Sequence, residues 1–546
     1  MIILIFFLTF STYLYTLYPT IQSFRDAGDL ITSAYTLGIA HPPAYPLYVI
    51  LGKIWAILMP FGNIAYRMNL FSAFTSSTCV AIIYIIINKK FESKWLGIII
   101  ALSLALSTAF WKQSILSEIY SLNALLAILI IYILLFNTNK ILLLSFLFGL
   151  GLGNHQTLLF LIPGILYFLI TSNYRLNMKT IKYLMVSFLL GFSIYIFLPI
   201  RASNQPVNNW GNPKNFGNFI KVLSRADYGT IKLSSRYSGT NSSFRDSLNI
   251  YWALLKDHIG VIGILLLIIG IVFSLNNTFR MTILLLFLFT GPFFIFLSRL
   301  PKNEFSMAML DPACALPAIF VVILIGIGLV KLIPKSIIPV FILFPLFLGV
   351  TNFHKINKRY NFLALDYGKN LMLSIPKNSF LSMIADMPIF TVNYLQYAGK
   401  ARQDVNVVYN SYLPWRLEEY ESKYPALFPK GLYSSTTDCL LKNSAKLPVY
   451  TEGVHSGLED FVTPIGLACK LSLNDNFKIK ATNVKNTVYL YNLYRFRKSK
   501  DTLDYYEKQV ISYYTSACFN ASVILKEGGL IKESDKVLEQ SNKFND

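Results

Sequence analysis

Two carboxylates and a histidine lie close together near the start of the sequence, and these residue types can do acid–base chemistry. Asp26 and Asp29 are three residues apart, so on a helix they would be neighbours on one face. Such a pair can supply a general base and a group that orients it, or it can simply cap a helix N-terminus. His41 precedes Pro42 and Pro43, which predict a rigid extended turn. Asp26 and Asp29 are therefore candidate catalytic residues, and His41 is a candidate binding residue or part of a structural turn.

Three more candidates interrupt or end apolar segments. Glu118 lies in WKQSILSEIYSLNA, where a pair with Lys112 is the ordinary alternative to a functional role. His155 interrupts GLGLGNHQTLLFL, and the alternative is a buried histidine bonded to the backbone. Arg201 ends FLPIRAS; its planar guanidinium suits a phosphate, whereas an interfacial arginine is the routine alternative. Each signal is weak alone, but all three residues are expected on one side of a membrane.

The composition identifies the surroundings of these residues as a membrane. Of the 546 residues, 54% are hydrophobic and 14% are charged, against about 25% charged in a soluble domain. The net charge of +21 comes largely from Lys and Arg in short loops beside apolar segments, so it does not indicate nucleic-acid binding. Phosphate-loop, HExxH and GxSxG motifs are absent from the sequence, as is any metal-ligand spacing of cysteines. We expect no metal and no cofactor.

The apolar segments predict a polytopic α-helical protein with about eleven transmembrane helices. They fall at residues 1–18, 68–88, 95–110, 119–136, 139–153, 156–171, 181–199, 258–275, 280–297, 313–332 and 336–352. The run at 44–59 contains Lys53 and is short, so it is expected to lie at the interface or to re-enter the membrane. The excess of Lys and Arg in alternate loops favours an outward first loop. An odd number of spans then places everything after residue 353 outside as well.

The remaining sequence predicts one soluble region with strands and a helical end. The expected organisation is a transmembrane domain 1–353 with outward loops 19–67 and 200–257, an α/β domain 354–500, and a helical hairpin 501–546 that resembles one tetratricopeptide-type pair. Strand-like runs are found at 380–386, 405–410, 447–452 and 487–494. Cys439 and Cys469 fall in this region and would be able to pair in an oxidising compartment.

Five blocks of the sequence resemble the protein O-mannosyltransferase-like family of integral-membrane glycosyltransferases, within the GT-C superfamily. In chain order they are RDAGDLITSAYTLGIAHPPAYPLY, WKQSILSEIYSLNALL, GLGNHQT, FLPIRAS with NNWGNPKNFGNFIKVLSRADYG, and DMPIFTVNYLQYAGKARQDVNVVYNSYL. They reach to about residue 412. In this family the first loop more often carries Glu where Asp29 stands and Gly where Ala44 stands.

The resemblance implies transfer of a sugar, mannose in this family, from a polyprenyl-phosphate-linked donor to Ser or Thr hydroxyls of extracytoplasmic proteins, with inversion. It implies Asp26 as the base and Asp29 as the group that orients the base or the acceptor. The phosphate would need cations, with Arg201 first and Arg225 and Lys302 behind it. In the same reading His41, Glu118 and His155 line the sugar pocket. Donor, acceptor protein and membrane lipid are the implied partners.

Two other functions fit the sequence less well. A related GT-C enzyme would use the same donor class with a glycan or lipid acceptor. A transporter or lipid flippase would place its binding groups near the bilayer midplane within repeated halves, and no such repeat is visible in the sequence. The Lys- and Ile-rich composition favours a bacterial inner membrane, with the active site and the C-terminal domain on the periplasmic side.

Overall fold

The computed structural model divides the chain into two compact units. It describes residues 1–24, 26–172, 174, 177–230, 244–275, 277–409, 419–422, 424–425, 428–429, 436–445, 447–455, 457–473, 475–497 and 502–545. The first unit comprises Met1–Tyr18 and Ser33–Arg359, and the second comprises Pro19–Thr32 and Tyr360–Asp546. The boundary near the N-terminus therefore falls inside one helix, α2 (Ala27–Thr36).

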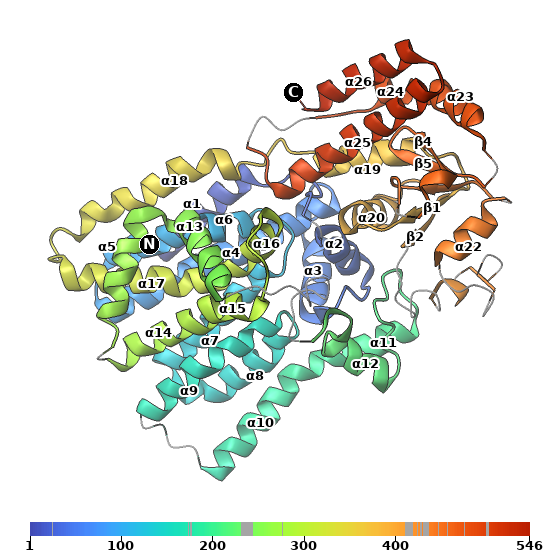
Figure 1. Cartoon of the computed structure of the whole chain (residues 1–546). Coiled ribbons are helices and arrows are strands. Elements are labelled where there is room, and N and C mark those ends of the chain that lie inside the picture. The colour runs from blue at the N-terminus through green and yellow to red at the C-terminus, as the bar shows by residue number, and fades with distance from the viewer. Residues whose placement is uncertain are drawn as a thin grey trace. The chain divides into compact units, whose positions relative to one another are not determined.

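The first unit is built of helices throughout its described residues (Figure 1). In chain order its main helices are α1 (Ile2–Thr16), α3 (Pro46–Leu58), α4 (Ile64–Phe91), α5 (Lys94–Ala105), α6 (Thr108–Ser114), α7 (Tyr120–Phe136), α8 (Ile141–Leu152), α9 (Ile162–Thr171), α10 (Met178–Phe192), α11 (Phe197–Ser203), α12 (Phe216–Leu223), α13 (Phe244–Val272), α14 (Thr278–Leu288), α15 (Phe294–Ser298), α16 (Glu304–Leu310), α17 (Ala315–Leu332) and α18 (Leu343–Ile356). Short 3₁₀ or π turns join several of them, including η2 (Gln156–Leu161), η3 (Ser193–Ile196), η4 (Ala226–Tyr228), η6 (Phe289–Phe293), η7 (Asp311–Cys314) and η8 (Ile338–Ile342).

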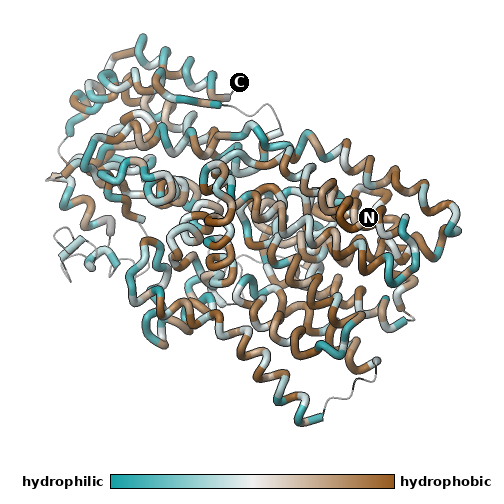
Figure 2. The backbone as a smooth tube through the Cα atoms, turned by 180° about the vertical axis from the view of Figure 1, so that it is seen from behind, coloured by the Kyte–Doolittle hydropathy of each residue, from teal (hydrophilic) through white to brown (hydrophobic). Residues whose placement is uncertain are grey.

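These helices make the chain a polytopic membrane protein. Among the described residues, six helices are long and apolar enough to cross a bilayer, or seven if the bent pair α5 and α6 forms one span. The expected count of eleven is not confirmed, because α1, α3, α7 and the segments around α8 and α9 are apolar but shorter. Figure 2 shows hydrophobic residues dominating the helices of the first unit, whereas hydrophilic residues are mixed through the second.

Small residues allow the helices of the first unit to pack closely. Ser145 and Gly149 on α8 face Ser187 and Gly191 on α10, and each serine Oγ donates to a backbone carbonyl of the opposite helix, at 2.8 and 2.6 Å. A Cβ on Gly191 would lie 2.1 Å from the carbonyl oxygen of Phe146. With little hydrophobic driving force between helices inside lipid, such close backbone contacts and interhelical hydrogen bonds supply the association.

Helix breaks gather where the polar residues of this unit are found. The axes of α5 and α6 differ in direction by 66°. Gly260 interrupts α13 with a φ of 66°, a conformation that glycine adopts without steric cost. α8 ends before residues 154–155, and η7 precedes α17. Each break frees backbone groups and lets a polar side chain stand at the end of an apolar helix.

The second unit contains a five-stranded mixed sheet in the order β2-β1-β3-β5-β4 (Figure 1). The strands are β1 (Phe380–Met383), β2 (Asn406–Tyr409), β3 (Val449–Thr451), β4 (Val462–Ile465) and β5 (Ala468–Leu471). β1 pairs in parallel with β2 and β3, and β4 and β5 form an antiparallel hairpin. α20 (Asp386–Asn393), extended by η9 (Tyr394–Ala398), connects β1 to β2. The expected strands at 380–386, 405–410 and 447–452 are thus confirmed.

One expected strand is wrong. Residues 487–494 include the end of α23 (Phe477–Thr487) and all of α24 (Leu490–Leu493). The Tyr-rich composition of this run favours a strand, but the run is largely helical and its tyrosine side chains bond to the turn between β4 and β5. The hydroxyl of Tyr491 donates to the carbonyl of Gly466 at 3.1 Å, and that of Tyr494 accepts from the Leu467 N–H at 2.9 Å. These contacts tie the helix to the β4–β5 turn.

The other helices described in this unit are α19 (Leu363–Leu373), α22 (Thr436–Asn443), α25 (Tyr505–Glu527) and α26 (Ile531–Asn545), and its described residues also include the 3₁₀ turn η10 (Glu459–Phe461). α25 and α26 flank Gly528-Gly529 as expected, and α25 begins with a capping box formed by Asp504 and Glu507. Cys439 and Cys469 belong to one buried core cluster, and both are free thiols.

Candidate functional site

Five ring-bearing residues from four distant segments of the first unit form a cluster. The hydroxyl of Tyr45 lies 3.1 Å from Nε2 of His41, and the Tyr45 ring stacks on that of His155 with centroids 6.2 Å apart. The Tyr120 ring also contacts that of His155, with centroids 5.6 Å apart, and the Trp210 ring contacts that of His41 at 6.3 Å. We call His41, Tyr45, Tyr120, His155 and Trp210 the aromatic–histidine cluster.

The turn at His41 and the loop before α12 are fastened to each other. The Ala44 N–H donates to the carbonyl of His41 at 2.8 Å, which closes the turn that the two prolines predict. Ile39 forms a parallel bridge with Asn209, with the Ile39 N–H donating to the carbonyl of Asn208 at 2.7 Å and the Trp210 N–H to that of Ile39 at 3.3 Å. These bonds bring Trp210 against His41.

The break between α8 and η2 ties three elements together. Asn154 donates from Nδ2 to the carbonyl of Ile119 at 3.2 Å, and Gln156 donates from Nε2 to that of Leu223 at 2.7 Å. Between them, half-buried His155 contacts the Thr157 hydroxyl through Nδ1 at 2.6 Å. His155 is therefore bonded to a side chain as well as to its own backbone turn, unlike the simple buried histidine of the alternative interpretation.

Glu118 lies in the non-helical linker between α6 and α7 and is 3% exposed. Its Oε2 accepts the N–H of Ile119 at 3.2 Å, one residue before Tyr120 of the cluster. The ion pairs that the structure describes for Lys112 are with Asp311 and Asp257, so they lend no support to the alternative of a pair with Glu118. Glu118 and Asn154 thus both attach to Ile119, so the predicted residues His41, Glu118 and His155 come from adjoining parts of the first unit.

The candidate cations differ sharply in their surroundings. Arg201 donates from Nε to the carbonyl of Leu37 at 2.7 Å and from a terminal nitrogen to that of Thr36 at 3.3 Å. These carbonyls end α2, where a cation also balances the helix dipole. Arg201 therefore has a structural task, and its role as a phosphate ligand stays a prediction.

Arg225 is the better placed cation. Its guanidinium lies over the ring of Tyr228 at 5.7 Å, and its Nε is buried without a hydrogen-bond partner among the described residues. Its positive charge, after burial, helps to hold the pKa of His155 below the ordinary value of 6.5. Lys302 is exposed on the turn before α16, and the described residues give its side chain no ion pair. The charge of Arg225 thus acts on His155 of the cluster, whereas the role of Lys302 stays a prediction.

Asp26 and Asp29 belong to the second unit. Asp26 is half-buried immediately before α2, and Asp29 is fully buried in the first turn of that helix, where a carboxylate is stabilised by the helix dipole. A Cβ on Gly28 between them would lie 2.4 Å from the carbonyl oxygen of Phe390, so this turn is packed tightly against α20. The catalytic roles of Asp26 and Asp29 stay predictions.

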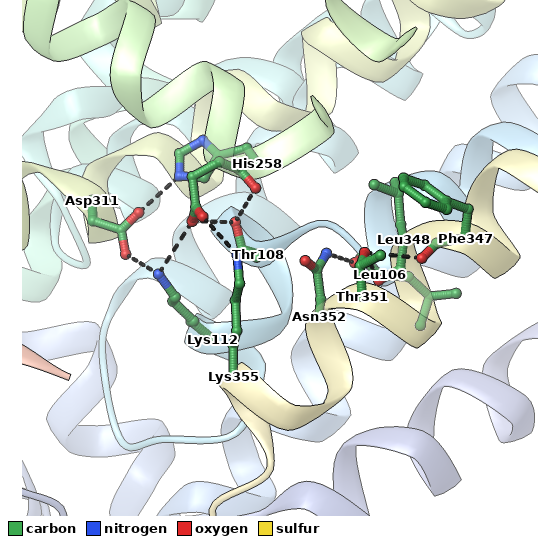
Figure 3. Close-up of polar contacts among 11 residues, drawn as sticks. Leu106, Thr108, Lys112, His258, Asp311, Phe347, Leu348, Thr351, Asn352 and Lys355 are labelled. Carbon is green, nitrogen blue, oxygen red and sulfur yellow. Dashed lines mark hydrogen bonds and ion pairs between the residues drawn. The ribbon is translucent and has the colours of Figure 1, made fainter. Parts of the chain in front are cut away.

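Sequence reasoning missed a charged network in the first unit (Figure 3). Asp311 accepts from Nζ of Lys112 at 3.1 Å, and its other oxygen lies 2.8 Å from Nε2 of His258. Asp257 pairs with Lys355 at 3.1 Å and lies 3.8 Å from Lys112. The residues come from α6, α13, η7 and α18, and the two lysines match the two carboxylates in charge. The only sequence signal was their position at the ends of expected spans on one face.

The described residues contain no group of three His, Cys, Asp or Glu side chains arranged to hold a metal ion. The expectation that the chemistry needs no metal stays a prediction. What the described part of the first unit does offer is a set of aromatic faces, two imidazoles, a buried carboxylate and Arg225, whose Nε has no hydrogen-bond partner there. Sites of this composition suit a polar ligand with some apolar surface.

The apolar helices of the first unit and the mixed sheet of the second define the class of the protein as a polytopic integral membrane protein with a folded α/β unit. The polar residues described above lie at the ends of its apolar helices. Comparison with known proteins then shows what it is similar to. Residues 26–178 match the family described as "Protein O-mannosyl-transferase TMEM260 N-terminal domain". The resemblance to O-mannosyltransferase-like proteins is therefore confirmed.

Two relatives extend the similarity beyond that domain. Protein O-mannosyl-transferase tmem260 of Dictyostelium discoideum is 25% identical over 83% of this chain and 63% of its own length. Protein O-mannosyl-transferase TMEM260 of Mus musculus is 26% identical over 71% of this chain and 60% of its own length. The chain thus spans less than two thirds of either relative. Both come from eukaryotes and lend no support to a bacterial inner membrane. No solved structure matches.

Proposed function

We propose that this chain is a GT-C-like membrane glycosyltransferase that moves a sugar, mannose by analogy with its relatives, from a polyprenyl-phosphate donor to Ser or Thr hydroxyls of proteins. The observation that carries the proposal is the aromatic–histidine cluster, which gathers His41, His155 and Trp210 from segments far apart in the sequence. The names of the two relatives supply the reaction class.

The reaction is a single displacement at the anomeric carbon. The acceptor oxygen forms a bond to that carbon, the bond from the carbon to the phosphate oxygen breaks with its electron pair, and the configuration inverts. The hydroxyl proton passes to a base, for which Asp26 is our candidate, with Asp29 orienting it or the acceptor. The phosphate leaves as an anion, so it needs positive charge and no proton donor. No cofactor or metal takes part in this scheme.

In this proposal the aromatic–histidine cluster holds the sugar. The rings of Tyr45, Tyr120 and Trp210 offer apolar faces, and the imidazoles and Glu118 offer hydrogen bonds that fix orientation. Arg225 replaces Arg201 as the first candidate for the phosphate, because the guanidinium of Arg201 is engaged by two carbonyls of α2. Lys302 is the weakest of the three candidates.

The placement of the site at helix ends suits a lipid-borne donor. Its isoprenoid tail would lie in the bilayer and its phosphosugar at the surface, among membrane lipids. We propose that this surface is extracytoplasmic, as loop charge favours. One network supports this orientation, since it joins Lys112, Asp257, Asp311 and Lys355. These residues lie at the ends of four apolar segments, and the loop charges predict that all four ends face outward.

The direct test is to incubate the purified full chain with labelled polyprenyl-phosphate-mannose and Ser- or Thr-containing peptides. Labelled peptide is expected with the wild type, and Asp26→Asn should lower turnover by about 10²–10⁴-fold while donor binding persists. Glu539→Gln, at an exposed acid of α26, is the matched control. No transfer by the wild type, or full activity of Asp26→Asn, would refute the proposal; transfer only to glycolipid would change the acceptor.

The two arginines give a second test. Arg225→Gln should weaken donor binding by about tenfold or more, since hydrogen bonds to charged groups contribute about 1.5–3 kcal/mol. Arg201→Gln should instead lower thermal stability, because it removes both bonds to the end of α2. The reverse pattern would restore Arg201 as the phosphate ligand.

A further inference from the structure

The two ring nitrogens of His155 differ in their surroundings. Nδ1 lies 2.6 Å from the hydroxyl oxygen of Thr157 and 3.4 Å from the backbone nitrogen of the same residue. The described residues offer Nε2 no hydrogen bond, and the residue is half-buried, so that side of the ring remains accessible. The ring itself contacts those of Tyr45 and Tyr120, with centroids 6.2 and 5.6 Å away.

The bonds around Thr157 determine which nitrogen carries the proton. A backbone N–H can only donate, so its contact with Nδ1 requires a lone pair there. Asn123 donates from Nδ2 to the Thr157 hydroxyl oxygen at 3.0 Å, which leaves the hydroxyl proton free to point at Nδ1. Both contacts therefore make Nδ1 an acceptor, and a neutral imidazole must then carry its proton on Nε2.

The surroundings also favour a neutral ring. Enclosure by protein atoms, the positive charge of Arg225 and the neighbouring His41 all hold the pKa of His155 below its ordinary value. The ring and hydrogen-bond contacts described for His155 are with Tyr45, Tyr120 and Thr157, none of which carries a carboxylate. Within the part of the chain that the structure describes, His155 thus has no carboxylate partner of the kind that usually raises the basicity of a histidine.

We propose that a relay from Asn123 through Thr157 fixes His155 as a neutral donor, whose Nε2–H binds an oxygen of the lipid-linked sugar phosphate. Asn123 and Thr157 are positioning residues that set the tautomer and do not touch the ligand. The identity of the ligand rests on the proposed function, whereas the tautomer does not. The oxygen belongs to the sugar or to the phosphate, and the two sources share the same acceptor chemistry.

The tautomer is measured without any ligand. The chain has five histidines, so ¹⁵N spectra of the full chain labelled at histidine are simple, and the signals missing from His155→Gln identify His155. We expect a protonated Nε2 and a bare Nδ1 near neutral pH. Thr157→Val should mix the tautomers, and Thr157→Ser should restore the single form, which a merely space-filling role of Thr157 would not do. A proton on Nδ1 of the wild type would overturn the relay.

The donor role is tested with two substitutions that each keep one nitrogen position. A Gln side chain places its NH₂ near the position of Nε2, and an Asn side chain places it near Nδ1. His155→Gln should bind polyprenyl-phosphate-mannose nearly as well as the wild type, and His155→Asn should bind about five- to tenfold more weakly, the value of one hydrogen bond. Equal binding by the two variants, or stronger binding by His155→Asn, would refute the donor role.

Polyprenyl phosphate without the sugar separates the two oxygen sources. If the phosphate accepts the bond, His155→Asn weakens binding of this probe as well; if the sugar does, only the mannose-bearing donor is affected. An absence of binding to the wild type would count against the proposed function and the ligand together, while the ¹⁵N spectra still decide the relay.

Discussion

At the scale of single residues, the sequence allowed candidate site residues to be chosen, but the hydrogen bonds that decide their roles depend on the fold. Arginine at the end of an apolar segment suits a phosphate, yet Arg201 donates to Thr36 and Leu37, and such bonds depend on where α2 ends in space. His155 could be selected from the sequence because it interrupts an apolar run. Its hydrogen bonds to Thr157, and through it to Asn123, required the fold.

Ala44 illustrates how a turn constrains one residue. It is fully buried and has a φ of 75°, in the left-handed region that favours glycine. Ala44→Gly should leave the free energy of unfolding unchanged or raise it by about 1 kcal/mol, because relief of strain is partly offset by a freer unfolded chain. Thermal unfolding in detergent measures the effect.

The comparison variant is Ala44→Val. Valine is disfavoured at positive φ because its side chain is β-branched. It should lower stability by about 1–3 kcal/mol. A valine as stable as the wild type would mean that the His41 turn has a different backbone conformation from the one described.

At the scale of elements, hydropathy located most helices, but their breaks and contacts came from packing. α13 was expected to begin at residue 258, and it begins at Phe244 and bends at Gly260. The run 487–494 has the composition of a strand, and contacts with Gly466 and Leu467 make it helical. The strand propensity of a short segment is small enough for a few tertiary hydrogen bonds to override it.

The contact of α8 with α10 gives a sharp prediction. Gly191→Ala places a methyl group 2.1 Å from the carbonyl oxygen of Phe146, so the helices must separate and stability should fall by about 1–3 kcal/mol. Gly217→Ala, in the open helix α12, is the matched control and should stabilise by up to about 1 kcal/mol through helix propensity. Equal melting temperatures of the two variants would contradict the close packing.

The charged network predicts unequal effects of its members. Asp311→Asn removes the anion that Lys112 and His258 share and leaves Lys112 only the longer contact with Asp257 at 3.8 Å; the side chains of Asp311 and His258 are only 15% and 6% exposed. We expect a loss of about 1–3 kcal/mol, reduced from the value for a buried pair because Lys112 is partly solvated. Lys355→Met removes a pair that is half exposed and should cost less than about 1 kcal/mol. Chemical or thermal unfolding of both variants measures the difference.

At the scale of the whole molecule, the class of fold was predictable because the sequence is so apolar, and the order of recognisable blocks indicated the family. The number of spans was not predictable in the same way, since several apolar helices are shorter than a bilayer is thick. The aromatic–histidine cluster comes from four segments, and its arrangement depends on how the helices cross and where they break. The hydrophobic periodicity of the sequence does not predict either feature.

The orientation can be tested by labelling single cysteines with a membrane-impermeant maleimide. All five native cysteines are buried, which keeps the background low. Lys302→Cys should react from outside intact cells, and Lys94→Cys should react only after permeabilisation; both side chains are exposed. If Lys94→Cys reacted from outside and Lys302→Cys only after permeabilisation, the membrane topology would be the reverse of the one predicted.

The packing of Gly28 on Phe390, and of the Phe24 ring on Tyr506 at 5.0 Å, has a consequence for how the chain is made. In the sequence the two acids precede nearly all the membrane helices, whereas Phe390 and Tyr506, which pack on Gly28 and Phe24, follow those helices. The turn that carries the acids therefore cannot reach its final packing until the membrane helices between it and Phe390 have been synthesised. A stalled or truncated product would carry the acid pair without its final shape.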